Sequence, residues 1–330
     1  MDISILDCTL RDGVHVNGGD FGESCIKSVI SALDSGKVEI IEVGFLRDCA
    51  YKSGSSVYSC LEDFENILNK NVESQISLMI RAGEFKAVNL RKSPFVDIIR
   101  VAFYKNELED AKGLIKSAKN LGYKVAANPI NIGVYDKNEI VELLGILTKM
   151  PLDIVSIVDT FGMFRLESFK EICEIFMQKI PPQITLGLHL HENFSLTLGL
   201  VASFLADIKC DRSVIIDASL YGMGRIPGNL CTELLADYLN QTFDKNYNLS
   251  PLLDVIYKEI EPFKLKNPWG YNPAYLLSAS KGVHRDYAEL LNKRRINYKD
   301  MDGILNEIKD SNKHLRFDKE FIESLLKEWL

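Results

Sequence analysis

Short apolar runs rich in isoleucine and valine recur along the first 220 residues, and each has the length of a β-strand. The eight runs are Ile3–Cys8, Glu39–Phe45, Ile76–Ile80, Asp97–Phe103, Tyr123–Pro129, Asp153–Asp159, Ile184–His191 and Ser213–Ser219. Between the runs, apolar residues follow a helical spacing, as over Ile26–Leu33. Further helices are expected near residues 61–68, 107–121, 167–180, 196–209 and 229–243, and after a capping box at Asp136 and Glu139. This alternation predicts a parallel sheet covered on both faces.

Eight strand–helix units are the count of a (β/α)8 barrel, the TIM barrel. A doubly wound open sheet is the alternative, but the glycine-rich turn that such sheets carry after the first strand is missing, since Gly18-Gly19 comes too late. After residue 245 the pattern changes. Asn246–Pro251 predicts a linker, and helical stretches follow near 252–260, 273–291, 300–310 and 318–329. We therefore expect a TIM-barrel catalytic domain over 1–245 and a C-terminal helical extension over 246–330.

Two histidines stand near the end of the seventh predicted strand. Side chains alternate along a strand, so His189 and His191 should both point into the barrel, where enzymes of this fold carry their chemistry. Two imidazoles at this spacing can reach one ion, such as Zn, Mn, Fe or Co. The alternative is a pair of histidines hydrogen-bonded in the barrel mouth.

The first predicted strand ends in a second polar cluster. Asp12 completes a set of two histidines and one carboxylate, which leaves coordination positions for a substrate. Arg11 can stabilise an enolate or carboxylate, and His15 can exchange a proton near neutral pH. The alternative is an Arg–Asp salt bridge that closes a turn. Two histidines of the extension, His284 and His314, are expected at the surface.

Composition limits the classes of protein and partner. Of 330 residues, 46% are hydrophobic and 26% charged, which excludes a disordered or collagen-like chain. The net charge of −7 argues against nucleic acid or an anionic membrane as the main partner. Neither a transmembrane stretch nor a signal peptide is predicted. The seven cysteines never form C-x-x-C, which favours reduced thiols in a cytoplasmic protein.

Several motifs in a fixed order carry a resemblance to a known family. They are Leu10-Arg11-Asp12-Gly13, Glu42-Val43-Gly44, Asp159-Thr160-Phe161-Gly162, His189-x-His191-x-Asn193, and Gly222-x-Gly224 through Gly228-Asn229. Together they resemble the metal-dependent lyases and aldolases of the superfamily that contains HMG-CoA lyase, isopropylmalate synthase and 4-hydroxy-2-oxovalerate aldolase. His15 stands where the acyl-CoA-using members carry Gln and the oxovalerate aldolases carry His, so the resemblance favours the aldolases.

The resemblance implies a site and a reaction. Its metal ligands would be Asp12, His189 and His191, with Asn193 as a ligand or as a hydrogen-bond partner of one, and Mn²⁺ is the first expectation before Mg²⁺ or Co²⁺. His15 would take the C4-hydroxyl proton of a 4-hydroxy-2-oxo acid, and Arg11 would hold the pyruvate enolate. The remaining residues implied at the substrate are Glu42, Thr160 and Tyr271.

One departure from the family concerns the second substrate. Arg225 interrupts the glycine-rich last loop of the oxovalerate aldolases, and it can recognise a second anionic group, so the aldehyde stays open. The leading expectation is a class II pyruvate aldolase acting on a 2-oxo acid and an aldehyde. The alternatives are an acyl-CoA condensing synthase or lyase, and a non-catalytic binding subunit. The extension offers a surface for a homodimer, but it matches too poorly to imply the aldolases' partner, an acylating aldehyde dehydrogenase.

Overall fold

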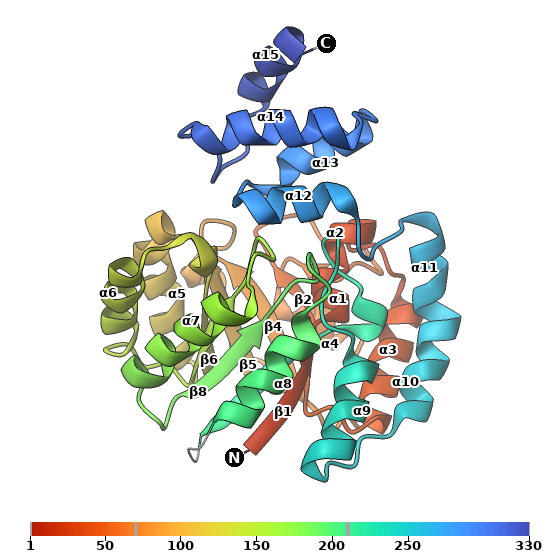
Figure 1. Cartoon of the computed structure of the whole chain (residues 1–330). Helices are drawn as coiled ribbons and strands as arrows, with labels where there is room; N and C mark the ends of the chain where they lie inside the picture. The colour runs from red at the N-terminus through yellow and green to blue at the C-terminus, as the bar shows by residue number, and fades with distance from the viewer. Residues whose placement is uncertain (1, 69–70, 209–211, 330) are drawn as a thin grey trace.

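The computed structural model describes residues 2–68, 71–208 and 212–329. Within these residues, nine parallel strands form one sheet, and eight of them close into a barrel because β1 pairs with both β2 and β9. The barrel strands are β1 (Asp2–Asp7), β2 (Ile40–Leu46), β4 (Gln75–Arg81), β5 (Ile98–Phe103), β6 (Lys124–Pro129), β7 (Ile154–Val158), β8 (Thr185–His189) and β9 (Ser213–Ala218). The predicted TIM barrel is confirmed (Figure 1).

A ninth strand, β3 (Val57–Tyr58), pairs with the end of β2 and was not predicted, because two residues carry no readable periodicity. The alternation within β8 is as expected. Leu186, Leu188 and Leu190 belong to the apolar layer between strands and helices, whereas the inner face of the barrel carries a separate cluster that includes Leu6, Ile98 and Ile215.

The helices predicted between the strands are present around the barrel. They are α3 (Glu23–Ser35), α4 (Leu61–Glu65), α5 (Leu108–Asn120), α6 (Lys137–Leu147), α7 (Leu166–Lys179), α8 (Thr197–Asp207) and α9 (Thr232–Phe243). The capping box before α6 forms as predicted, since the Glu139 amide donates to Asp136 (2.9 Å) and the Asp136 amide donates to Glu139 (3.1 Å). Short turns complete the barrel: α1 (Thr9–Asp12), α2 (Val14–Asn17), η1 (Ala87–Asn89), η2 (Lys105–Glu107), η3 (Ile132–Val134) and η4 (Leu220–Gly222).

The helical extension has two parts that pack differently. The first is α10 (Leu249–Val255), the π-helix η5 (Ile256–Ile260) and α11 (Glu261–Lys266); Leu252, Ile260 and the following Trp269 belong to the barrel core. The second is α12 (Pro273–Lys281), α13 (Arg285–Lys293), α14 (Tyr298–Asp310) and α15 (Lys319–Trp329), which share a core of their own. The packing therefore changes between Trp269 and Ala274, and the domain boundary at residue 245 stays a prediction.

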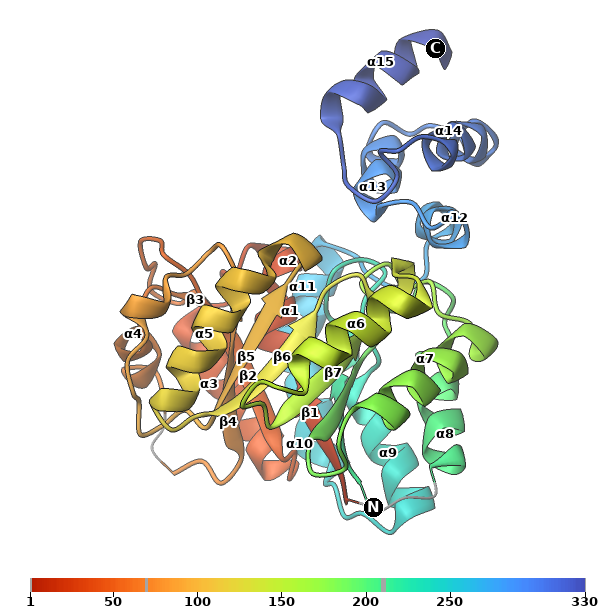
Figure 2. The same cartoon turned by 90° about the vertical axis from the view of Figure 1, so that its left-hand side faces the viewer.

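The helices α12 to α15, which we call the cap, stand over one end of the barrel (Figures 1 and 2). This is the end at which the strands finish, because Asn193, just beyond β8, donates to the carbonyl of Tyr275 in α12 (3.2 Å). None of the described helices is long and apolar enough to cross a membrane. Six cysteines have free thiols, and Cys210 lies outside the described residues.

Candidate active site

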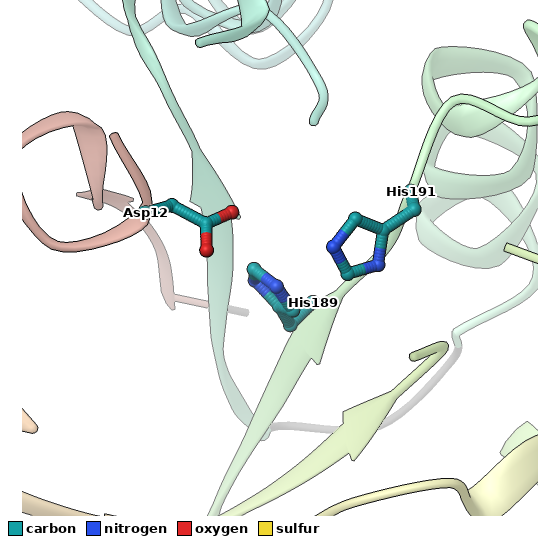
Figure 3. Close-up of side chains that lie close together, drawn as sticks. All are labelled: Asp12, His189 and His191. Atoms are coloured by element: carbon teal, nitrogen blue, oxygen red, sulfur yellow. The ribbon is translucent and has the colours of Figure 1, made fainter. Parts of the chain in front are cut away.

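Three predicted metal ligands meet at the barrel mouth (Figure 3). Asp12 lies in α1 directly after β1, and one ligand atom each of Asp12, His189 and His191 falls within 4.8 Å of the others. The prediction that β8 runs to His191 was wrong: the strand ends at His189, and His191 instead forms a backbone bridge with Asn229. The two imidazoles still face each other edge to face, with ring centroids 5.0 Å apart. A carboxylate and two imidazoles in this arrangement suit a divalent cation.

Each imidazole is oriented through its Nδ1 atom. Nδ1 of His191 hydrogen-bonds to the carbonyl oxygen of Asp159 (2.8 Å), so this nitrogen carries the proton. Nδ1 of His189 lies 3.0 Å from a carboxylate oxygen of Asp217, a close contact although it is not aligned as a hydrogen bond. Both arrangements leave Nε2 as the free ligand nitrogen.

The charge states suit metal binding. Burial lowers the pKa of His191 to about 3, so its ring is neutral at physiological pH. Burial by itself would raise the pKa of Asp12, but the Arg11 guanidinium and the neighbouring histidines outweigh it and hold that pKa well below its usual range. The site therefore presents one anion and a neutral imidazole without the need to release protons.

A chain of buried ion pairs crosses the barrel beneath this site. Arg11 contacts Asp12 and donates from Nε to Glu42 (2.6 Å), and Glu42 also lies 3.1 Å from Arg100. Arg100 in turn pairs with Asp217. The Arg11–Asp12 salt bridge weighed as an alternative is thus present, but as part of a larger network. Glu42 is fully buried and lies behind Arg11, and it does not line the cavity.

Sequence reasoning missed the role of Arg100 and Asp217. Arg100 is 2% exposed although it stands inside the apolar strand β5. A charged residue in the middle of such a run is itself a signal, because buried charges are found paired. The partners of Arg100 are remote in the sequence, so the signal does not identify them.

A cavity of about 220 Å³ opens over the metal ligands. Of the predicted substrate residues, Arg11, Thr160 and Arg225 line it, as does His15. Nε2 of His15 lies 3.8 Å from Asp12. About a third of the His15 side chain (35%) is exposed, but the ring is set in the cavity wall. This burial, together with the nearby cations Arg225 and Arg11, outweighs the opposite effect of Asp12 and lowers the pKa of His15 to about 4. The ring is then neutral and able to accept a proton.

Besides Glu42, two predicted site residues lie outside the cavity. Tyr271 is 58% exposed in the segment between α11 and α12, and it does not line the cavity. Asn193 is buried but is turned towards the cap, where it donates to Tyr275 and packs against Gly162. Gly162 has a φ of +60°, and a Cβ there would fall on the Asn193 side chain.

Asn229 lies at the site instead. It belongs to one of the motifs shared with the family, but the sequence assigned it no role. Its amide nitrogen contacts Asp12, while its oxygen is buried without a hydrogen-bond partner among the described residues. Because the two ends of an amide are interchangeable by rotation, Asn229 can present an oxygen beside Asp12. Gly224 makes the approach possible, since a Cβ there would come within 2.7 Å of the Asp12 carboxylate.

The comparisons with known proteins agree with this geometry. The model of the family described as HMGL-like matches residues 2–257. The chain belongs to the HMGL-like family. It is 27% identical over 260 residues to 4-hydroxy-2-oxovalerate aldolase 6 from Rhodococcus jostii, covering 77% of this chain and 71% of that protein. It is 25% identical over 291 residues to 4-hydroxy-2-oxovalerate aldolase from Geobacillus genomosp. 3, covering 86% and 84%.

Solved structures share the fold. The N-terminal domain of an aldolase candidate from Bacteroides vulgatus matches with a TM-score of 0.76 and 26% identity, over 90% of this chain and 98% of that one. Pyruvate carboxylase from Rhizobium etli matches with a TM-score of 0.69 over 100% of this chain and 36% of that one, and at 11% identity this likeness concerns the fold alone. The HMGL-like chain is thus an aldolase-like enzyme with a candidate metal site at Asp12, His189 and His191.

Proposed function

We propose that this HMGL-like enzyme is a class II pyruvate aldolase, which cleaves or forms a 4-hydroxy-2-oxo acid from pyruvate and an aldehyde. One observation carries the proposal: a neutral base, His15, shares a cavity with a buried carboxylate–imidazole set and with the fixed cation Arg11. The aldolase names of the relatives support it.

The metal is expected to be Mn²⁺, with Mg²⁺ or Co²⁺ as alternatives. Asp12, His189 and His191 would hold it, and a rotated Asn229 amide, whose oxygen has no hydrogen-bond partner in its present position, would add a further oxygen donor. When bound, such an ion supplies a Lewis acid for the keto and carboxylate oxygens of a 2-oxo acid. Asn193 and Tyr271, implied by the resemblance, remain predictions whose side chains lie outside the cavity.

The residues of the chain account for the proton and charge transfers. His15 takes the proton from the C4 hydroxyl; the C3–C4 bond breaks, C4 becomes the aldehyde carbon, and the electron pair stays with the pyruvate enolate. Arg11 stabilises the enolate charge, an effect of about 3 kcal/mol for a well-placed donor. The Thr160 hydroxyl accepts a hydrogen bond from the Asn131 amide (2.8 Å), which leaves its own proton for the substrate carboxylate. The enolate then gains a proton at C3 to give pyruvate, and the proton that His15 took from the hydroxyl leaves the imidazole, so that no net proton is consumed.

The test should not depend on the unknown aldehyde. An enzyme that forms the pyruvate enolate exchanges the methyl hydrogens of pyruvate with solvent, so deuterium should enter pyruvate in D₂O. We expect exchange, and pyruvate release from a racemic 4-hydroxy-2-oxo acid, to stop with EDTA and return with Mn²⁺. The His15→Gln variant should keep Mn²⁺ affinity by calorimetry and lose cleavage about 10²–10⁴-fold.

Three results would contradict the proposal. Activity that survives complete metal removal would exclude the metal-dependent reaction. Thiol release from acetyl-CoA with a 2-oxo acid would favour a condensing synthase. The absence both of metal binding and of any effect of pyruvate on thermal unfolding would point to a non-catalytic subunit.

A further inference from the structure

A second hollow, which we call the cap hollow, adjoins the catalytic cavity. It has a volume of about 580 Å³ and lies between the last barrel loop and the helices α13 and α15. His15 and Arg225 line both this hollow and the catalytic cavity. In the proposed reaction the aldehyde carbon is released beside His15, so groups attached to that carbon have a path into the cap hollow.

The cap hollow is rich in positive charge although the protein as a whole is acidic. Its walls carry the cations Arg225, Arg285, Lys293, Arg294 and Lys319 and the carboxylates Asp286 and Glu289. Glu289 is shared between Arg285 and Lys293, at 2.6 Å from each. Lys319 is exposed and forms no ion pair within the part of the chain that the structure describes. Arg294 also pairs with Glu323, which does not line the hollow, so five cations stand against three carboxylates in a chain whose net charge is −7.

Among these side chains, Arg285 gives the strongest indication of a ligand. It is 7% exposed, and its guanidinium stacks over the Tyr275 ring at 5.1 Å. Its Nε hydrogen has no aligned acceptor among the described residues, since the nearest carboxylate oxygen of Asp286 is 4.0 Å away. A buried guanidinium N–H without a partner is costly unless a ligand supplies the acceptor.

Arg225 completes a pair of guanidinium groups at the junction of the two cavities. It binds Asp286 at 2.5 Å and keeps a quarter of its side chain exposed. One carboxylate oxygen of Asp286 lies 2.5 Å from Arg225 and 4.0 Å from Arg285, so the two like charges are close together, and burial and then Arg225 lower the pKa of Arg285. Planar guanidinium forks match carboxylate and phosphate oxygens, so a ligand anion can bind beside Asp286 at the donors of both groups that this one carboxylate leaves free.

We propose, on the basis of the aldolase function above, that the cap hollow binds an anionic substituent of the aldehyde half of the substrate, with Arg225 and Arg285 as the recognising side chains. The substrate class is then a carboxylate-bearing or phosphate-bearing aldehyde rather than a short neutral one. Both anions offer the same oxygen acceptors, so the experiment must separate them.

The test compares condensation of pyruvate with aldehydes that have the same number of carbon atoms, in the full-length, Mn²⁺-loaded protein. Succinic semialdehyde is set against butanal, and glyceraldehyde 3-phosphate against glyceraldehyde. We expect kcat/KM to favour at least one anionic aldehyde over its neutral counterpart by about tenfold or more, and to do so less at high salt. The pair with the larger ratio identifies the carboxylate or the phosphate.

The variants locate the effect. Arg285→Gln should reduce the anionic-to-neutral ratio about tenfold through KM, and Arg285→Lys should restore part of it. Because Arg285 is buried, Lys319→Gln serves as a second variant that cannot disturb the core, and it should reduce the ratio by a smaller factor. Lys309→Gln removes an exposed cation of α14 that lines neither cavity, and it should leave the ratio unchanged.

The outcomes separate this proposal from the function on which it rests. Pyruvate exchange without any preference for anionic aldehydes would overturn the cap-hollow site and leave the aldolase proposal intact. A preference that persists in both Arg285→Gln and Lys319→Gln would place recognition elsewhere. If the variants lose kcat/KM equally for charged and neutral aldehydes and are also less stable to heat, Arg285 and Lys319 have a structural role only. Failure of pyruvate exchange in the unaltered protein would instead overturn the aldolase function.

Discussion

Arginines occupy two regions of this molecule, and the two regions hold them in different ways. In the barrel, at and beneath its mouth, Arg11 and Arg100 are buried, and each lies between two carboxylates. In the cap hollow, Arg225 and Arg285 are carried by a loop and a helix, and each has one close carboxylate. The barrel arginines are held on a rigid, hydrogen-bonded framework, which suits a site whose geometry must not change. The cap arginines are less completely paired, which suits groups that bind a ligand.

The largest expected effect concerns the buried network. In Arg100→Met, Glu42 and Asp217 lose their shared cation and remain buried, which should lower the free energy of unfolding by about 3–5 kcal/mol. Urea unfolding of the metal-free protein measures this loss.

The matched control is Arg81→Met. Arg81 lies on the neighbouring strand β4 and pairs with Glu84 and Glu107, but 31% of its side chain is exposed. Arg81→Met should lower the free energy of unfolding by less than about 1 kcal/mol, as for other half-exposed ion pairs. Equal losses in the two variants would remove the distinction between buried and exposed arginines on which the comparison rests.

The second prediction concerns the metal site above that network. The Asp217 carboxylate lies 3.0 Å from Nδ1 of His189, so Asp217→Asn should weaken Mn²⁺ binding about 10–100-fold, measured by calorimetry. Asp7→Asn is the control, because Asp7 is equally buried but binds Thr232 and Thr9 and touches no ligand. Unchanged affinity in Asp217→Asn, or the same loss in both variants, would show that the carboxylate does not position the histidine.

The two regions also differ in how far the sequence predicts them. Barrel strands are buried on both faces, so they appear as apolar runs, and Asp97–Phe103 differs from β5 by one residue at its start. The structure brings together Asp12, His189 and His191 but not Asn193 from the predicted ligand set, and the strand argument for His191 was wrong. The turn after β8 keeps both rings at the mouth because the chain there is bridged to Asn229.

The cap could not be placed in this way. Its helices can be predicted from their apolar faces, but the local sequence pattern does not determine which end of the barrel they cover. His284 shows the consequence: it was predicted at the surface, yet only 12% of its side chain is exposed, and its ring lies 5.5 Å from that of Phe161. The contacts of Asn193 and Arg225 with the cap depend on the same long-range packing.

The third prediction uses this buried histidine. Burial, with Arg225 and Arg285 nearby, outweighs Asp286 and lowers the pKa of His284 to about 4. The unfolded chain binds a proton near pH 6.5 and the folded chain does not, so stability is lost as the pH falls from about 6.5 to 4. His284→Asn removes the titrating group and retains a side chain that can cap α13.

Between pH 6 and pH 5, the free energy of unfolding of His284→Asn should therefore fall by about 1 kcal/mol less than that of the unaltered protein. Urea unfolding of the metal-free proteins measures both values. His15 and His191 titrate in the same direction in both proteins, so the difference isolates His284. The comparison at pH 8 reports the lost packing against Phe161 separately. Parallel stability curves would mean that the cap does not bury this ring in solution.

The smallest effect is expected at Tyr271, in the segment that joins the barrel to the cap. Its ring is 58% exposed and lines neither the catalytic cavity nor the cap hollow, so Tyr271→Phe should change kcat/KM for pyruvate condensation by less than about twofold. His15→Gln, at the cavity wall, is the positive control in the same assay. A tenfold loss of kcat in Tyr271→Phe would show that this segment closes over the bound substrate. The cap would then act in catalysis as well as in recognition, and the division between a fixed mouth and a ligand-binding cap would have to be redrawn.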